Sequence, residues 1–352
     1  MKKTVAACLA AMLLFAFGCS RKEEPKRYQA EFLTLFNTVT RVVGYANSEE
    51  EFRALAQTIR DRLTEYHQLY DIYNSYDGVN NLKTVNDNAG IRPVLVDQRV
   101  IDMLEFAKEQ YEATGGRVNV AFGAVLSIWH DYREAGIDDP ESAQLPPMEL
   151  LEEANRHTNI DDVVIDREAS TVYLKDPRMR LDCGAIAKGY ATEQVAQYLE
   201  SRGFQSLLLS VGGNIRAIGK KAVPDGEGEA RWTIGIQNPE KSSERTELMA
   251  VLIDGLSVVS SGNYERYYTV NGTRYHHIID PETLFPSACF NQVTILCGDS
   301  GLGDALSTAV FNMPLEEGRA YIDSLAGTEA LWVLKDGTTV CSAGFWDYVK
   351  PE

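Results

Sequence analysis

The sequence predicts an α+β fold of mixed, largely antiparallel sheets with covering helices. Two observations lead to this prediction. Strand-like segments crowd the second half of the 352-residue chain, where turn dipeptides join neighbouring segments into hairpins. Two long amphipathic segments stand in the first half. Antiparallel hairpins with the helices segregated from them along the chain are typical of α+β proteins.

Two helices are predicted from apolar residues at helical spacing. Residues 48–51, Ser-Glu-Glu-Glu, form a capping box that should start the first helix, which is expected to run from about 49 to about 70. A second helix is expected from about 98 to 113. Because each segment has one apolar face, both helices are expected to cover a sheet.

Runs of β-branched and aromatic residues predict the strands, at 163–166, 171–174, 207–209, 232–236, 248–253 and 258–260. Two hairpins are also expected, around Asn271-Gly272 and Asp336-Gly337, because these dipeptides tolerate the positive φ angles of tight turns. The second strand of the first hairpin is expected to span 274–279. Since no repeat or long linker interrupts the chain, residues 31–352 should form a single domain.

The charge of the chain excludes some partners. The formal net charge is -17 at pH 7, and so acidic a body repels nucleic acid and anionic lipid surfaces. We therefore expect no nucleic-acid partner. An anionic ligand needs a divalent cation or a local group of hydrogen-bond donors at its site, to offset this repulsion.

Residues 1–18 have the features of a lipoprotein signal peptide. Met1-Lys2-Lys3 precedes an apolar run of about 14 residues, which is too short to span a bilayer and is typical of an export signal. The small residues just before Cys19 resemble a bacterial lipobox, in which the cysteine carries lipid. An ordinary signal peptide with a chance cysteine is the alternative. Residues 19–30 would then be a lipidated cysteine and a polar tether, and the protein is expected on the outer face of the cytoplasmic membrane.

Two glycine-bearing segments are candidates for ligand binding. A strand is expected to end at Asp182, before Gly184 and a helix whose free N–H groups suit a carboxylate or a ligand phosphate. Gly212-Gly213 stands between apolar strands, where glycine permits the backbone to approach a neighbouring strand or a ligand. Taken singly, the first segment is also the pattern of an ordinary N-cap and the second that of a structural bulge.

A helix near the C-terminus carries three oxygen-bearing side chains. Asp304, Ser307 and Thr308 are spaced i, i+3 and i+4, so they share one helix face. Carboxylate and hydroxyl groups are the hard oxygen ligands that magnesium takes, and a magnesium ion bound to phosphates needs few protein ligands. The alternative is that these residues only cap the start of the helix.

Two adjacent histidines, His276 and His277, stand in the strand expected at 274–279. Adjacent residues of a strand face opposite sides, so only one of them can face a given cleft. A neutral imidazole there could take a proton from an attacking hydroxyl. An ordinary structural histidine is the alternative.

Taken together and in this order, these four motifs resemble the ApbE family, the FAD:protein FMN transferases. The family's motifs are similar to residues 182–190, 212–219, 277–281 and 304–308, with further matches at 116–123 and 232–239. The resemblance spans about residues 32–341. Three positions depart from the family pattern: Phe36-Asn37-Thr38 replaces Met-Gly-Thr, Gly123-Ala124 replaces Gly-Pro, and Leu284 replaces a glycine.

The resemblance implies a T-fold-like architecture with FAD as substrate and Mg²⁺ as cofactor. It implies that FAD lies against Phe36, Tyr73, the backbone of Asn119, Val120 and Ala121, and Asp182, Lys188, His277 and Ile278. It implies that the ion is held by the carbonyl of Ala185 with Asp304, Ser307 and Thr308. Such an ion would bridge the protein oxygens to the FAD pyrophosphate and offset the repulsion from the acidic body. His277 and Asp182 are the implied catalytic residues.

The implied reaction moves the FMN part of FAD to a threonine hydroxyl of another protein and releases AMP. His277 would be the base, and the metal would stabilise charge on the pyrophosphate. The acceptors of the family are flavoproteins of membrane or exported electron-transfer systems. Two alternatives use the same site: an FAD pyrophosphatase in which water replaces the threonine, and a non-enzymatic lipoprotein that binds FAD.

Overall fold

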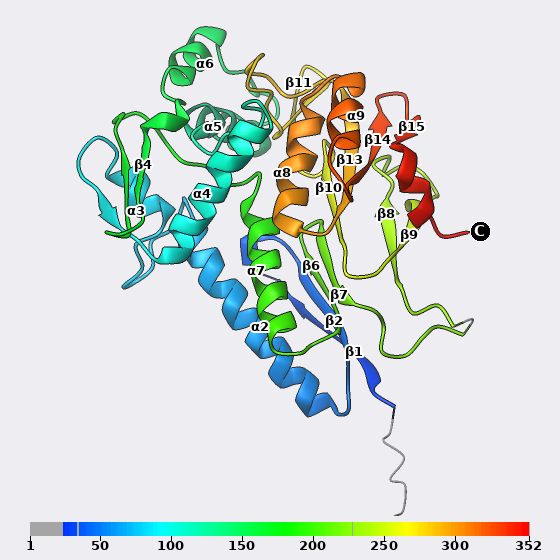
Figure 1. Cartoon of the computed structure of the whole chain (residues 1–352). Coiled ribbons are helices and arrows are strands. Elements are labelled where there is room, and N and C mark those ends of the chain that lie inside the picture. Colours follow the sequence, from blue (N-terminus) through cyan, green and yellow to red (C-terminus); the bar gives the residue numbers. More distant parts are fainter. Residues whose placement is uncertain (1–23, 34, 227, 352) are drawn as a thin grey trace, which may run out of the picture.

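A large antiparallel sheet forms the centre of the computed structural model, which describes residues 24–33, 35–226 and 228–351 (Figure 1). The strand order is β1-β2-β6-β7-β10-β13-β14-β15. These strands are β1 (Lys26–Phe32), β2 (Thr40–Ala46), β6 (Ser206–Val211), β7 (Asn214–Gly219), β10 (Ser257–Gly262), β13 (Phe290–Cys297), β14 (Glu329–Leu334) and β15 (Thr339–Cys341).

Three small sheets flank the large one. They contain β3 (Val94–Leu95), β4 (Val163–Asp166) and β5 (Thr171–Leu174); β8 (Trp232–Gln237) and β9 (Glu247–Ile253); and β11 (Tyr267–Val270) and β12 (Thr273–His276). Paired strands are antiparallel throughout, including in the large sheet, where Val258 of β10 lies opposite both Ile215 of β7 and Leu296 of β13. The α+β prediction is therefore confirmed.

The helices are α2 (Glu49–Tyr70), α3 (Leu82–Asp87), α4 (Gln98–Ala113), α5 (Gly123–Asp138), α6 (Met148–Asn155), α7 (Ala187–Ser201), α8 (Ser300–Phe311) and α9 (Leu315–Asp323). Short 3-10 turns are η1 (Leu35–Asn37), η2 (Ile160–Asp162) and η3 (Ala343–Tyr348). Within the described residues, no helix has both the length and the apolar composition needed to cross a membrane.

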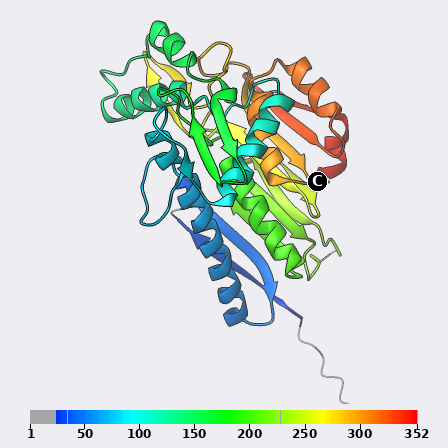
Figure 2. The same ribbon diagram turned by 60° about the vertical axis from the view of Figure 1, so that its left-hand side comes forward.

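Helices α2, α7 and α8 cover one face of the large sheet (Figures 1 and 2). Helix α2 packs on β1 and β2, α7 on β6 and β7, and α8 on β10 and β13. Their common core includes the fully buried side chains of Ile59, Leu209 and Leu306. Because each such side chain contributes about 1.5–3 kcal/mol when buried, this layer fixes the positions of α7 and α8, which reach the site described below.

The β8–β9 hairpin and η3 cover the opposite face of the sheet. Trp232 and Phe345 pack there with Leu296 of β13, whereas its neighbour Ile295 belongs to the helix-covered core. This alternation is the two-residue period of a strand buried on both sides. A third apolar cluster joins α5 to the β11–β12 hairpin through residues such as Trp129 and Tyr268.

Both predicted helices are observed with the predicted limits, as α2 and α4. The capping box also forms, because the Ser48 hydroxyl accepts from the N–H of Glu51 over 3.1 Å. The Glu51 carboxylate, however, accepts from the N–H of Asn47 at 3.0 Å, one residue earlier than in the usual box. The predicted strands and both predicted hairpins are present.

Two strand limits were wrong. The second strand of the first hairpin, β12, ends at His276 and not at residue 279, because its partner β11 begins at Tyr267, opposite His276. No strand ends at Asp182 either: Arg180 forms one isolated bridge, and the N–H of Asp182 donates to the carbonyl of Val120 at 2.8 Å.

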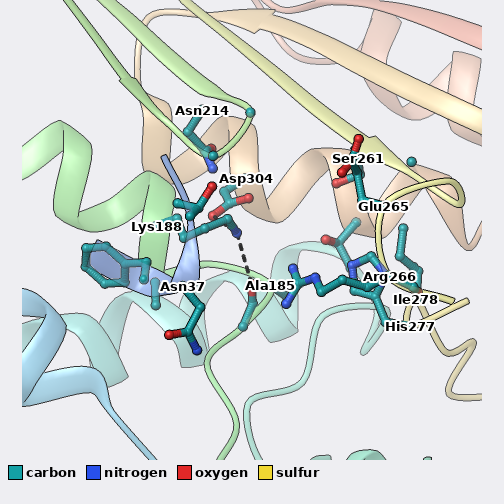
Figure 3. Close-up of a pocket in the computed structure, with 18 of the residues that line it drawn as sticks. Asn37, Ala185, Lys188, Asn214, Ser261, Glu265, Arg266, His277, Ile278 and Asp304 are labelled. Carbon is teal, nitrogen blue, oxygen red and sulfur yellow. Dashed lines mark hydrogen bonds and ion pairs between the residues drawn. The ribbon is translucent and has the colours of Figure 1, made fainter. Parts of the chain in front are cut away.

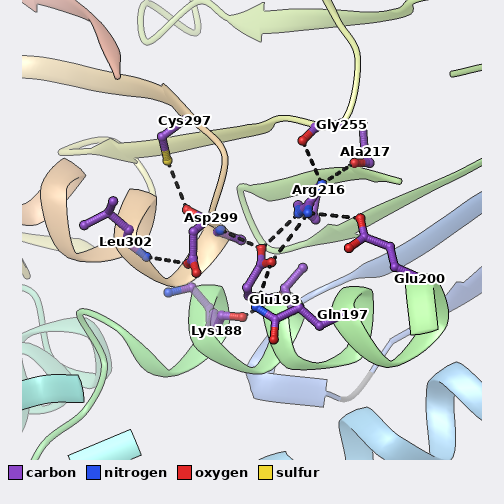
Figure 4. A network of polar contacts seen from close by, with 12 residues as sticks. Lys188, Glu193, Gln197, Glu200, Arg216, Ala217, Gly255, Cys297, Asp299 and Leu302 are labelled. Atoms are coloured by element: carbon purple, nitrogen blue, oxygen red, sulfur yellow. Dashed lines mark hydrogen bonds and ion pairs between the residues drawn. The ribbon is translucent and has the colours of Figure 1, made fainter. Parts of the chain in front are cut away.

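A buried charge network joins α7 to the sheet and to α8 (Figure 4). The Arg216 guanidinium of β7 donates to the Glu193 carboxylate at 2.9 Å, and the same carboxylate accepts from the N–H of Ser300, the first residue of α8, at 2.9 Å. Arg216 also donates to the carbonyl of Gly255 at 3.0 Å. Since buried charges are tolerated only with their partners in place, this network holds the two helices in one arrangement.

Candidate functional site

A cavity of about 960 Å³ lies where segments distant in the sequence meet. Its walls come from η1, the turn after α2, residues 117–122, α5, the turn before α7, the Gly212-Gly213 hairpin, residues 260–266, residues 275–281 and α8. This volume is near the upper end of the range for small-molecule sites, about 300–1000 Å³.

Most of the predicted site residues line this cavity: Phe36, Tyr73, Asn119, Asp182, Ala185, Lys188, His277, Ile278, Asp304 and Thr308. Val120, Ala121 and Ser307 are buried and are not among the lining residues. The carbonyl of Val120 accepts from Asp182, and the N–H of Ala121 donates to the Asn119 side chain at 2.9 Å. These two residues thus support side chains that do line the cavity.

Two aromatic residues of the cavity lining are held by contacts with the end of α2. The N–H of Phe36 donates to Nδ1 of His67 at 3.3 Å. Asp71 accepts from the N–H of Tyr73 at 2.6 Å and from the hydroxyl of Tyr76 at 2.7 Å. Tyr73 remains 53% exposed, so one face of its ring is available for stacking on a ligand. The roles of His67 and Asp71 were not predicted from the sequence.

Asp182 forms the turn before α7. Its Oδ1 accepts from the N–H of Gly184 at 2.8 Å, and burial raises the pKa of its carboxyl group although this hydrogen bond opposes the shift. Desolvation, together with the charge of Asp182, raises the pKa of Tyr73 to about 12, so this phenol is neutral at physiological pH. The helix itself begins later, at Ala187, and Asp182 is not its N-cap.

Asp304 links α8 to the start of α7. Its Oδ2 accepts from the N–H of Gly189 at 2.8 Å and lies 3.6 Å from the ammonium group of Lys188. Asp299, and not Asp304, is the N-cap of α8, because its side chain accepts from the N–H of Leu302 at 2.9 Å. The interpretation of Asp304 as a mere cap of its own helix was therefore wrong.

Ser307 lies behind Asp304. Its hydroxyl is fully buried, donates to the carbonyl of Asp304 at 2.9 Å and shares a hydrogen bond of 2.7 Å with Ser261. Thr308, one residue later, lines the cavity. The three residues predicted to share one helix face therefore have two roles. Asp304 and Thr308 line the cavity, whereas Ser307 packs against β10.

The oxygen groups here fit magnesium better than a transition metal. Within the described residues, no group of three or more His, Cys, Asp and Glu side chains could hold a metal ion. A carboxylate at Asp304, a hydroxyl at Thr308 and the Ala185 backbone line one cavity instead. Asn214 lines it as well, and its buried Oδ1 has no hydrogen-bond partner among the described residues. Such an unpartnered oxygen suits a hard cation or its bound water.

Both histidines are among the residues that line the cavity, so the expectation that only one would face it was wrong, but their environments differ. His276 uses both ring nitrogens within the protein: Nδ1 accepts from the N–H of Ile278 at 3.3 Å, and Nε2 donates to the carbonyl of Ser287 at 2.9 Å. In His277, Nδ1 contacts the carbonyl of Arg266 at 3.3 Å. A carbonyl can only accept, so Nδ1 carries the proton, and the lone pair of Nε2 has no hydrogen-bond partner among the described residues.

Both histidines are held neutral. Burial lowers the pKa of His276 to about 4. Burial first, and then the positive charge of Arg266, lower the pKa of His277 well below its ordinary value. Of the two, only His277 combines a neutral ring with an uncommitted nitrogen, which is the state required of a general base.

Figure 3 shows that the labelled side chains of the cavity come from two opposite sides. Lys188, Asp304 and Asn214 come from the helix and sheet side, while Arg266, His277 and Ile278 come from the hairpin side. The Arg266 side chain extends from the hairpin side toward Ala185. Neither Arg266 nor Asn214 was predicted as a site residue, although Asn214 lies within the 212–219 motif and Arg266 contacts His277.

Two departures from the family pattern fall at left-handed backbone positions. Asn37 has φ +53° and Leu284 has φ +61°, conformations that glycine adopts without strain. Asparagine is among the side chains that best tolerate this region. Leu284 is 5% exposed, and its carbonyl accepts from the Trp129 indole at 2.9 Å, so burial of the side chain offsets the backbone strain.

Known proteins resemble this chain over most of its length. A model of the ApbE family matches residues 36–332. An FAD:protein FMN transferase of Treponema pallidum (strain Nichols) is 35% identical over 275 residues, which cover 76% of this chain and 75% of the relative. An FAD:protein FMN transferase of Klebsiella pneumoniae (strain 342) is 30% identical over 291 residues, covering 82% of this chain and 85% of the relative.

Solved structures have a fold similar to that of this chain. The ApbE protein from Thermotoga maritima superposes with a TM-score of 0.79 at 28% identity, covering 93% of this chain and 100% of that chain. The flavin transferase ApbE from Vibrio cholerae superposes with a TM-score of 0.75 at 23% identity, covering 92% and 99%. Fold, ordered motifs and sequence identity agree, and the chain belongs to the ApbE family.

Proposed function

We propose that this chain transfers the FMN part of FAD to a threonine hydroxyl of an acceptor flavoprotein, with magnesium as cofactor and AMP as the released product. One observation carries the proposal. A neutral His277 with a free Nε2 and the oxygen group of Asp304 and Thr308 line a single cavity of about 960 Å³. The FAD:protein FMN transferases of Treponema pallidum and Klebsiella pneumoniae support it, since they match most of this chain.

In this reaction the acceptor hydroxyl attacks the phosphorus next to riboflavin. His277 takes the hydroxyl proton on Nε2, the new O–P bond forms, and the bond to the AMP phosphate breaks with its electron pair on the leaving oxygen. Phe36 and Tyr73 line the cavity, and their rings are suited to contact a flat ring. The chemistry depends on positioning and on neutralising charge, which this chain's cationic and oxygen-bearing side chains can supply.

The residues that would hold magnesium are Asp304, Thr308 and the carbonyl of Ala185, with Ser307 holding the backbone of Asp304 from behind. A bound ion supplies Lewis-acid stabilisation of the pyrophosphate charge. The ammonium group of Lys188 lies 3.6 Å from Oδ2 of Asp304. It therefore compensates part of the negative charge of this carboxylate.

The test uses the purified protein with FAD, magnesium and a flavoprotein domain that carries a threonine acceptor. Mass spectrometry should show FMN covalently bound to the acceptor and one AMP released for each FMN transferred. If the acceptor stays unmodified while free FMN and AMP appear, the protein is an FAD pyrophosphatase. If FAD stays intact with and without magnesium, the protein is only a binder, and the proposal is wrong.

Membrane attachment is a separate part of the proposal. Cys19, after the apolar run that ends at Phe17, supports a lipid anchor on the outer face of the cytoplasmic membrane, and acceptors would then be membrane or exported flavoproteins. Cys19 lies outside the described residues. Cys19→Ala should leave a soluble or unprocessed protein with normal flavin chemistry. Recovery of that variant in the membrane fraction at normal length and amount would refute the lipid assignment.

A further inference from the structure

We infer that Arg266 binds the FAD phosphate that the acceptor hydroxyl attacks, the one next to riboflavin, and is a catalytic residue of the transfer. The nature of the ligand depends on the proposed function, whereas the choice of residue depends on the geometry of the cavity. Three features of Arg266 support this: its charge is unpaired among the described residues, its backbone is fixed to the base, and it shares with the base an environment that favours an anion.

Arg266 is the cation of the lining that has no carboxylate partner within the described residues. Each of the others has one: Lys188 lies 3.6 Å from Asp304, and the remaining pairs are Arg133 with Glu134 at 3.2 Å, Arg41 with Glu31 at 2.7 Å, and Arg117 with Glu282 at 2.8 Å. In a chain of net charge -17, a free guanidinium in a cavity is available for an incoming anion. Its planar set of donors matches two phosphate oxygens.

The backbone of Arg266 is fixed to His277. The carbonyl of Arg266 accepts from the backbone N–H of His277 at 3.1 Å and from Nδ1 of its ring at 3.3 Å. Figure 3 shows the Arg266 side chain on the same side of the cavity as His277, across from Lys188 and Asp304. The phosphorus under attack must lie within reach of the base. It must therefore lie at the Arg266 end of the cavity, and the AMP phosphate toward Asp304.

The electrostatics of this end favour an anion. Desolvation and then the neighbouring Arg133 guanidinium lower the pKa of Arg266, and the positive charges of Arg266, Arg133 and Lys188 all lower the pKa of His277. These like charges repel one another, and the carboxylates of Asp182 and Asp304 offset that repulsion on Arg266 only in part, because its pKa stays lowered. Phosphate oxygens would remove that repulsion, and the attacked phosphate gains negative charge in the transition state, where a preorganised cation acts most strongly.

The binding test uses titration calorimetry with riboflavin, FMN and AMP to determine which of the two FAD phosphates Arg266 binds. Arg266→Gln should weaken FMN binding about ten- to a hundredfold and leave riboflavin and AMP binding nearly unchanged. Arg274→Gln is the matched control, because Arg274 lies on the same hairpin, outside the cavity lining, with its guanidinium 4.9 Å from the Tyr267 ring. Equal loss for riboflavin would mean a structural role, and loss for AMP alone would mean the other phosphate; either result overturns the inference.

The kinetic test uses single-turnover transfer from FAD to the acceptor domain across a pH series. Arg266→Gln should slow transfer about 100- to 1000-fold. It should also move the acid limb of the profile to higher pH, because removal of a cation lets His277 protonate more readily. Arg266→Lys should recover part of the rate.

A normal rate with Arg266→Gln, or a profile whose acid limb does not move, would overturn the inference even though the wild-type enzyme works. If the wild-type protein transfers no FMN, the proposed function fails instead, while the FMN and riboflavin titrations still decide whether Arg266 binds this phosphate.

Discussion

The backbone N–H of Gly189 donates to Oδ2 of Asp304 over 2.8 Å, so the first turn of α7 holds the carboxylate of α8. This contact requires glycine. A Cβ at position 189 would lie 2.2 Å from the carbonyl oxygen of Ser300 and 2.5 Å from Cβ of Asp304. The partial positive charge at the start of α7 also favours a carboxylate there. The two helices thus place Asp304 at the cavity wall before any ligand arrives.

Gly189→Ala should therefore separate α7 from α8. We expect the free energy of unfolding to fall by about 1–3 kcal/mol, as for other overpacked sites, and magnesium binding to weaken because Asp304 moves. Denaturant unfolding and calorimetric titration with magnesium measure the two effects. Gly298→Ala is the control, since a Cβ there meets no atom within 4 Å. Unchanged stability of the 189 variant would show that the helices can adjust.

Asp304→Asn should remove the magnesium dependence of transfer without unfolding the protein. The amide can still accept from Gly189, so the melting temperature should stay close to that of the wild type, while the carboxylate charge that attracts the ion is lost. Thr308→Val should have a smaller effect, because it removes one neutral ligand. Single-turnover transfer at limiting magnesium measures both. Normal turnover by Asp304→Asn would place the metal elsewhere.

His277→Ala should slow transfer about 100- to 10,000-fold, the usual contribution of a general base, with a much smaller change in FAD affinity. His276→Ala should instead lower stability, because its ring bonds to Ile278 and Ser287 would be lost. Transfer rates and thermal unfolding of the two variants distinguish these roles. The assignment is contradicted if His276→Ala is inactive while folded and His277→Ala is active.

The rate of transfer should stay constant as the pH falls below the ordinary pKa of histidine, because His277 stays neutral there. Because burial and Arg266 lower the pKa of His277 well below 6.5, the reactive neutral ring persists as the pH falls through 6.5. We expect kcat/KM for FAD to hold constant there and to fall only at distinctly lower pH. Rates from pH 4 to pH 8, corrected for unfolding, test this. A midpoint at or above 6.5 assigned to His277 would contradict it.

Asn37 should tolerate glycine but not alanine. Its side chain is exposed and its φ is +53°, so Asn37→Gly is expected to change the free energy of unfolding by only a few tenths of a kcal/mol, whereas Asn37→Ala should lower it by about 1 kcal/mol. Denaturant unfolding measures both. Equal stability of the two variants would show that the turn relaxes out of the left-handed region.

Features of the fold that depend on residues close together in the sequence were predicted correctly. The limits of α2 and α4 follow from apolar spacing and caps, and the Asp304 motif follows from the periodicity of a helix. Spacing could not show that Ser307 packs against Ser261, since that contact depends on where β10 lies beside α8. The unpaired charge of Arg266 was not predictable either, because it depends on which carboxylates of other segments come near.

Dependence on distant segments also explains the error in the predicted strand that carries His276 and His277. Their adjacency in the sequence suggested alternation along one strand, but the strand ends at His276 because its partner has ended. The two rings are distinguished by their hydrogen bonds, one to Ser287 from a distant loop and one to Arg266 across the hairpin. Neither partner is implied by the residues next to the histidines.

Strand β1 also lies between the first described residues and the cavity. Its 7 residues run from Lys26 to Phe32 and lead directly to η1, whose Phe36 lines the cavity. At about 3.3 Å per residue, the strand spans about 23 Å. A surface that held the chain just before Lys26 would thus be separated from the catalytic opening by a rigid arm of that length. On the proposed function and the proposed lipid anchor, an acceptor threonine would have to lie at a matching height above this surface.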